Sequence, residues 1–184
     1  MAAHPEAQRT AQDEIDRVFG DTLPKDVDGT QLPYLRAVFW EASRFEIRFE
    51  HRREKYMAFT NAHQVLRWRP SFPTSIPHAT SKDDTYNGHF IPAGTTVLMN
   101  TWAIHHNEED YPNADQFDPT RFLENEFGTA SSDPSANDAS RRRTYAFGAG
   151  RRVCAGQDMA EKTMLLSMAK LLWAFDMRYG SQYL

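Results

Sequence analysis

The chain contains very little cysteine, since Cys154 is the single one among 184 residues. An intrachain disulfide is therefore excluded, and a lone cysteine is most often a small buried hydrophobic side chain. Long apolar runs are also lacking. The longest, residues 164–175, is interrupted by Ser167 and Lys170 and is too short to cross a bilayer. Residues 1–14 have no apolar run, so we expect neither a signal peptide nor a membrane anchor in this chain.

An excess of positive charge is absent as well. The 21 Lys and Arg residues are outnumbered by 25 Asp and Glu residues, which gives a formal net charge of -4. Without a basic field, the sequence predicts no nucleic-acid partner. The 4 tryptophans and 12 phenylalanines are too many for a disordered chain, and the length suits about one domain.

Three helices are predicted from turn residues and apolar spacing. Pro5 favours the start of a helix and Gly20 its end, and a second helix is expected to begin near Leu32. A last helix is expected after Gly156. Its predicted apolar stripe consists of Ala160, Met164, Met168, Leu171, Leu172 and Phe175.

Short strands are predicted between the second and the last helix. Residues 71–100 have β-type signals, with Asn87-Gly88 as a hairpin turn and a short strand from Thr95 to Met99. Residues 124–143 are expected to form a surface loop, because they are rich in small and polar residues. The fold class expected from this pattern is α+β, with a few helices and a small antiparallel sheet.

The most informative segment is residues 147–156, which read Phe-Gly-Ala-Gly-Arg-Arg-Val-Cys-Ala-Gly. A glycine-rich turn runs into the start of a helix, and Cys154 lies at the junction. Free backbone N–H groups at such a helix start can stabilise a thiolate. Glycines let the backbone pass close to a flat ligand and adopt positive φ. Arg152 can pair with a carboxylate of that ligand.

This segment resembles the haem-binding loop of the cytochrome P-450 family, whose pattern is Phe-x-x-Gly-x-Arg-x-Cys-x-Gly. The resemblance implies that Cys154 is the axial thiolate ligand of a haem b iron and that Arg152 pairs with a haem propionate. Phe147 would shield the sulfur. Gly150 and Gly156 would allow close approach of the haem.

Two further segments resemble the same family. Its Glu-x-x-Arg helix pairs with an arginine of a later Pro-x-Arg-Phe segment, and residues 119–122 supply that arginine as Arg121. Thr120 stands where an acidic residue is common in the family. Pro77-His78 resembles a site at which a histidine or arginine binds a haem propionate. A plain surface role is the alternative for Arg121 and for His78.

The Glu-x-x-Arg pattern itself is interrupted. Glu41 and Arg44 satisfy it literally, but the continuation that the family has, Val-Leu-Arg-Trp-Arg-Pro, begins at Val65. Joining Glu41 to Val65 would restore the family pattern, with Glu41 and Arg67 as the pair and Arg44 as a competitor. We interpret residues 42–64 as an insertion, either a retained intron or a genuine helical insertion.

Two adjacent histidines offer an alternative that we set aside. His105 and His106 stand near three acidic residues and could suggest a metal site. Adjacent histidines in a loop lack the spacing that places both on one metal.

The resemblance extends over most of residues 1–184 and implies the C-terminal part of the cytochrome P-450 fold, of a fungal microsomal type. It implies haem-thiolate monooxygenation of a small apolar organic substrate, with electrons from NADPH through a reductase. A role in secondary metabolism and an endoplasmic reticulum membrane location follow from the same resemblance. Complete members are more than twice as long, so this chain alone is expected to be inactive. An inactive haem-binding fragment or pseudogene product is the alternative, ahead of a structural domain with an inert cysteine.

Overall fold

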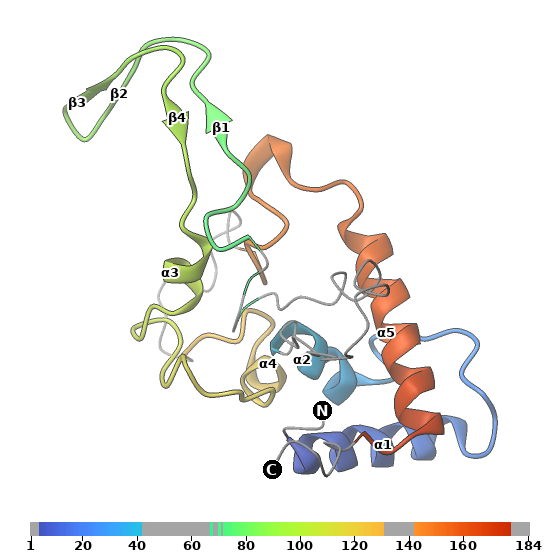
Figure 1. The fold of residues 1–184 in the computed structure, drawn as a ribbon. Coiled ribbons are helices and arrows are strands. Elements are labelled where there is room, and N and C mark those ends of the chain that lie inside the picture. Colours follow the sequence, from blue (N-terminus) through green and yellow to red (C-terminus); the bar gives the residue numbers. More distant parts are fainter. Residues whose placement is uncertain (1–3, 42–66, 68–69, 71, 131–141, 178–184) are drawn as a thin grey trace, which may run out of the picture.

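The computed structural model describes residues 4–41, 67, 70, 72–130 and 142–177. Helices and short antiparallel strands occupy different parts of the molecule, so the fold is α+β, as predicted. Figure 1 shows most of the helices gathered in one body, from which the strands extend as an arm.

Helix α1 (Pro5–Phe19) has the ends that the sequence predicted. Pro5 lies in the first turn, where its missing N–H removes no helical hydrogen bond, and Gly20 follows the last turn with a φ of 53°. One face is buried at helical spacing and consists of Ala7, Gln8, Ala11, Glu14 and Ile15.

Helix α2 (Pro33–Glu41) is the centre of the helical body. Helices α1, α4 (Arg121–Glu124) and α5 (Gln157–Ala174) all pack against it. A helix with neighbours on several sides is buried over most of its surface, and this is true of Leu35, Ala37, Val38, Phe39, Trp40 and Glu41. The last of these places a carboxylate inside the core.

Helix α5 faces the core with a stripe that matches the predicted one only in part. Its buried residues are Leu165, Ala169 and Leu172, whereas Leu171 and Phe175 are 50% and 63% exposed. Met164 and Met168 of the predicted stripe pack against the core. The prediction was wrong for Leu171 and Phe175, because apolar residues lie on several sides of this helix and spacing alone does not select the buried face. No helix within the described residues is long and apolar enough to span a bilayer.

The arm consists of two antiparallel strand pairs, β1 (His78–Ala79) with β4 (Thr96–Val97) and β2 (Asp84–Tyr86) with β3 (His89–Ile91). Asn87 and Gly88 join β2 to β3 with φ values of 48° and 79°. Two positive φ angles are typical of the tight hairpin turn that this dipeptide predicted. Helix α3 (Thr101–His105) follows the arm and leads the chain back toward the helical body.

Residues 124–143, predicted as a surface loop, are partly anchored where the structure describes them. Gly128 and Thr129 are buried. A Cβ atom at Gly128 would come within 2.7 Å of the Phe122 ring, so the backbone packs directly on that side chain. Residues 131–141 lie outside the described residues, as do residues 42–64 and, with them, Arg44.

Candidate functional site

A buried ion pair joins the end of α2 to Arg67. The Arg67 Nε donates to Glu41 Oε2 at 2.6 Å, and Nη2 donates to Oε1 at 2.6 Å. Such a two-pronged contact between guanidinium and carboxylate fixes both side chains. Both residues are 0% exposed, where an unpaired charge would be very costly. The structure places Arg67 against Glu41, whereas Arg44, the other arginine that the sequence offered, lies outside the described residues.

Arg67 also binds the main chain between α3 and α4. Its Nη atoms donate to carbonyl oxygens at distances between 3.0 and 3.3 Å, those of His105, Ala114 and Gln116. Glu41 Oε1 accepts from the Asp118 N–H at 3.0 Å. The ion pair therefore holds α2, the end of α3 and the segment before α4 together.

Arg121 is the second cation beside Glu41. It is the first residue of α4, it is 8% exposed, and its Nε lies 3.5 Å from Glu41 Oε1. Thr120, which stands where the family often has an acid, donates its N–H to the Asp118 carboxylate at 3.0 Å. An acidic side chain is thus present two residues before the expected position.

The cysteine loop precedes α5 and contains a short 3-10 turn, η1 (Gly150–Arg152). Gly148 and Gly150 have φ values of 81° and 63°, a region that residues with a Cβ enter at a cost. The Cys154 N–H donates to the Phe147 carbonyl at 2.9 Å and closes the loop. Phe147 packs against the helical core and so ties the loop to it.

Gly156 was expected to allow close approach of the haem. It is the N-cap of α5 with a φ of -89°, so its use lies in the space that it leaves. A Cβ at Gly156 would lie 3.8 Å from the Cys154 sulfur. The first helical N–H, that of Gln157, donates to the Cys154 carbonyl at 3.3 Å. A glycine therefore keeps one side of the sulfur free of side chain.

The Cys154 thiol is exposed. This contradicts the common role of a lone cysteine as a buried hydrophobic side chain. A thiolate is a ligand that haem iron accepts, and the flanking glycines leave room for a flat group. The residues present therefore fit a haem.

The two residues predicted to bind propionates are both exposed and belong to different elements. Arg152 ends η1, and His78 begins β1 in the arm, opposite Val97. Among the described residues, the Arg152 side chain makes no hydrogen bond or ion pair, and none joins the His78 side chain to the cysteine loop.

The histidine pair has structural contacts. The His105 Nε2 accepts the Tyr145 N–H at 3.1 Å, and His106 stacks on Trp102 with ring centroids 4.3 Å apart. The Glu108 carboxylate accepts two main-chain N–H groups, at 2.8 and 3.1 Å. No local sequence pattern predicts the contact between His105 and the start of the cysteine loop.

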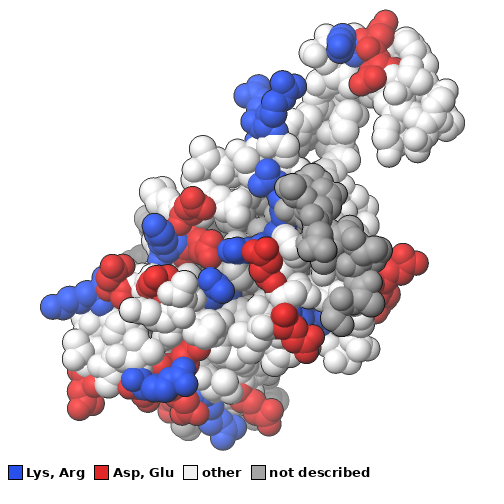
Figure 2. Space-filling view, turned by 180° about the vertical axis from the view of Figure 1, so that it is seen from behind, with Lys and Arg blue, Asp and Glu red and all other residues white. Residues whose placement is uncertain are grey.

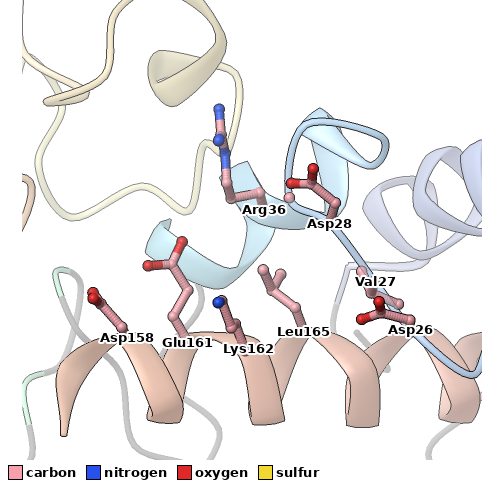
Figure 3. Close-up of a pocket in the computed structure, with 9 residues that line it drawn as sticks. Asp26, Val27, Asp28, Arg36, Asp158, Glu161, Lys162 and Leu165 are labelled. Carbon is pink, nitrogen blue, oxygen red and sulfur yellow. The ribbon is translucent and has the colours of Figure 1, made fainter.

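A surface pocket of about 440 Å³ lies between α5 and the segment that precedes α2 (Figure 3). Its lining carries charges of both signs, and burial raises the pKa of Glu161, against the opposing effect of Arg143 and Arg36. The lining residues are Asp26, Val27, Asp28, Gly29, Arg36, Asp158, Glu161, Lys162 and Leu165. Cys154 and its loop are not among them, so this pocket is distinct from the candidate haem site.

Known proteins resemble this chain over nearly its whole length. Cytochrome P-450 monooxygenase yanC of Aspergillus niger is 40% identical over 177 residues, which cover 96% of this chain and 28% of that protein. Cytochrome P-450 monooxygenase fogE of Aspergillus ruber is 40% identical over 174 residues, which cover 95% of this chain and 28% of that protein. A zebra fish cytochrome P-450 solved with progesterone superposes with a TM-score of 0.70 and 31% identity, over 95% of this chain and 33% of that chain.

The chain spans 28% of the length of these curated relatives. The family model for cytochrome P-450 matches residues 1–55 and 48–182, so its two segments meet inside residues 42–64. The family match, the relatives and the shared fold lead to one conclusion: the chain belongs to the cytochrome P-450 family.

Proposed function

We propose that this chain forms the cysteine-ligand side of the haem site of a haem-thiolate monooxygenase. The observation that carries the proposal is the exposed thiol of Cys154, which follows a loop with two positive-φ glycines and precedes α5. Its relatives at 40% identity are monooxygenases by name.

Each residue of the loop has a role in this proposal. Cys154 would supply the thiolate ligand of the iron, and Phe147, which packs on the core, would shield one side of the sulfur. Gly150 and Gly156 would give the haem room, while Arg152 and His78 would bind its propionates. The cluster of Glu41, Arg67 and Arg121 holds the chain segments around the site and does not touch the haem.

The bound haem b, when its iron carries a thiolate ligand, supplies the activation of dioxygen for insertion of one oxygen atom into a substrate. The residues of this chain position the group and set the electron density at its iron. We infer a small apolar organic substrate, because the structural neighbours were solved with progesterone and abiraterone. We also infer electrons from NADPH through a reductase, an endoplasmic reticulum membrane location for the whole protein and a role in fungal secondary metabolism.

A second candidate is a haem-binding fragment without catalysis. It is favoured by the open position of the thiol and by the exposed apolar side chains of the arm. Monooxygenation requires an enclosed, dry pocket and a positioned proton source on the side of the haem opposite the cysteine. The described residues with assigned roles all belong to the cysteine side.

The test supplies the 184-residue chain with haem, NADPH and a matching reductase, and measures substrate oxidation over a broad panel of apolar compounds. The same assay is run on a protein in which this chain is joined to the remaining segments of a relative. We expect product from the joined protein and none from the chain alone. Product from the chain alone, in step with NADPH consumption and abolished by Cys154→Ser, would contradict the fragment reading. No product and no haem binding in the joined protein would contradict the monooxygenase reading.

A further inference from the structure

His105 is fully buried at the end of α3, between the ion pair and the cysteine loop. Its main-chain carbonyl accepts from Arg67 Nη1 at 3.0 Å. Its ring Nε2 accepts the Tyr145 N–H at 3.1 Å. One residue therefore contacts the buried pair with its backbone and the segment that leads into the cysteine loop with its ring.

Tyr145 stands where the cysteine loop begins. Its carbonyl accepts the Gly148 N–H at 3.0 Å, and two residues after Tyr145 the Phe147 carbonyl accepts the Cys154 N–H at 2.9 Å. These contacts follow each other along a short stretch of chain. The position of Tyr145 thus determines where the loop starts and, through it, where the thiol lies.

The chemistry of the ring matters for this contact. A ring nitrogen that accepts an N–H is unprotonated, so His105 is neutral with its proton on Nδ1. Leucine has no acceptor and would leave the Tyr145 N–H without its partner, which is costly in a poorly hydrated place. Glutamine can place its Oε1 at about the position of the histidine Nε2 and accept the same hydrogen bond.

We propose that His105 is a positioning residue, which couples the Glu41–Arg67 pair to the loop that carries Cys154. The coupling up to Tyr145 depends on this chain alone. Its last step, from the loop to the haem, rests on the proposed function. The Nε2 lone pair faces the Tyr145 N–H, so this atom serves as an acceptor in the main-chain scaffold.

The test uses the full 184-residue chain as wild type, His105→Leu, His105→Gln and His105→Asn. His106→Leu is the matched control, because His106 is the neighbouring histidine and stacks on Trp102. Amide hydrogen exchange is measured on the segment from residue 144 to 156, with α1 and α2 as internal references.

We expect the Tyr145 amide of His105→Leu to exchange at least about tenfold faster than in wild type, and exchange at Cys154 to rise with it. His105→Gln and His106→Leu should exchange at the wild-type rate. Wild-type exchange in a folded His105→Leu chain, or equal acceleration in His105→Gln, would overturn the proposal.

If His105→Leu does not fold, His105→Asn replaces it, because its shorter amide does not reach the Tyr145 N–H. Folding of the glutamine variant alone would support the need for an acceptor at this place. Loss of folding in all three variants would contradict it, since the ring and not its acceptor atom would then matter.

A second measurement tests the step from the loop to the haem. After addition of haem, reduction and exposure to carbon monoxide, His105→Leu should give a smaller share of the thiolate-type Soret band than wild type, and His105→Gln should restore it. A full thiolate share in His105→Leu would contradict the last step. Failure of wild type to bind haem would defeat the proposed function, while the exchange result would still decide the coupling within the chain.

Discussion

Arg67 has its guanidinium bound entirely within the protein, to the Glu41 carboxylate and to main-chain carbonyls. Methionine at this position would leave the buried Glu41 with Arg121 Nε, 3.5 Å away, as the other cation that the described residues provide. Breaking a buried ion pair from one side costs about 3–5 kcal/mol. We expect Arg67→Met to lower the free energy of unfolding by that amount, as measured by denaturant titration.

Arg143→Met is the matched control for this change. Arg143 binds Glu126 at 2.9 Å, in a pair whose side chains are 39% and 58% exposed. Exposed pairs of this kind contribute below about 1 kcal/mol. If the free energy of unfolding fell by similar amounts in the two variants, the buried Arg67 pair would contribute no more to stability than an exposed pair, which would contradict the prediction.

Single residues differ in how far the sequence predicted them. Glu41 and Arg67 were predicted as a pair from the interrupted family pattern, and the structure shows their contact. The role of His105 was not predicted, because its partners Arg67 and Tyr145 lie 38 and 40 residues away along the chain. A hydrogen bond between distant segments leaves no local pattern.

At the scale of elements, α1 fixes α2 through a carboxylate. Glu14 is buried on α1 and accepts the N–H groups of Tyr34 and Leu35 at 2.9 and 2.8 Å. N–H groups in the first turn of a helix have no partner within the helix, so Glu14 supplies one. Its negative charge also interacts favourably with the positive end of the helix dipole. Glu14 thus caps the helix whose other end carries Glu41.

Glu14→Gln keeps the size of the side chain and removes the charge and one acceptor. We expect the free energy of unfolding to fall by about 1–2 kcal/mol, the usual value of a helix cap. Asp13→Asn on the exposed side of the same helix is the control and should change it by less than about 0.5 kcal/mol. Thermal unfolding of both variants decides this, and equal shifts in Tm would argue against the cap.

We propose that residues 42–64 are not native to the fold. Glu41 and Arg67 are in direct contact although they lie 26 positions apart in the sequence, and the two family segments meet inside residues 42–64. Deleting residues 42–64 would place Arg67 three positions after Glu41, on one face of a continuous helix. We expect the deletion chain to be the more stable one in denaturant. A clearly less stable deletion chain would mean that the segment is an evolved part of the protein.

The elements that the sequence predicted well are those with local signals. Pro5 and Gly20 mark the ends of α1, and Asn87-Gly88 forms the hairpin turn. The face of α5 was not predictable in the same way. Its sequence is apolar on several sides, so contact with α1 and α2 decides which side is buried.

For the whole molecule, the most conspicuous feature is the uncovered arm. Figure 2 shows that its surface is mostly uncharged, with a few charged side chains near its end. Large apolar side chains of the arm and of the segments beside it are between 46% and 70% exposed, namely Phe72, Ile76, Tyr86, Phe90, Val97 and Leu98. Apolar surface of this kind is typical of a contact region.

We therefore expect the purified chain to self-associate as its concentration rises. Replacing Ile76 and Phe90 together with serine should lower the association constant, because it removes apolar area from the arm. Light scattering over a concentration series measures this. A wild-type chain that stays monomeric at about 100 μM would contradict the expectation, because this concentration exceeds a micromolar dissociation constant by about a hundredfold.

The spectrum of the carbon monoxide complex tests the central claim most directly, namely that Cys154 is a haem ligand. The chain is loaded with haem, reduced and exposed to carbon monoxide, as wild type and as Cys154→Ser. Because Cys154 is the only cysteine, we predict a thiolate-type Soret band in wild type and its loss in the serine variant. A thiolate-type band that persists in Cys154→Ser, or haem bound by wild type without such a band, would contradict the assignment.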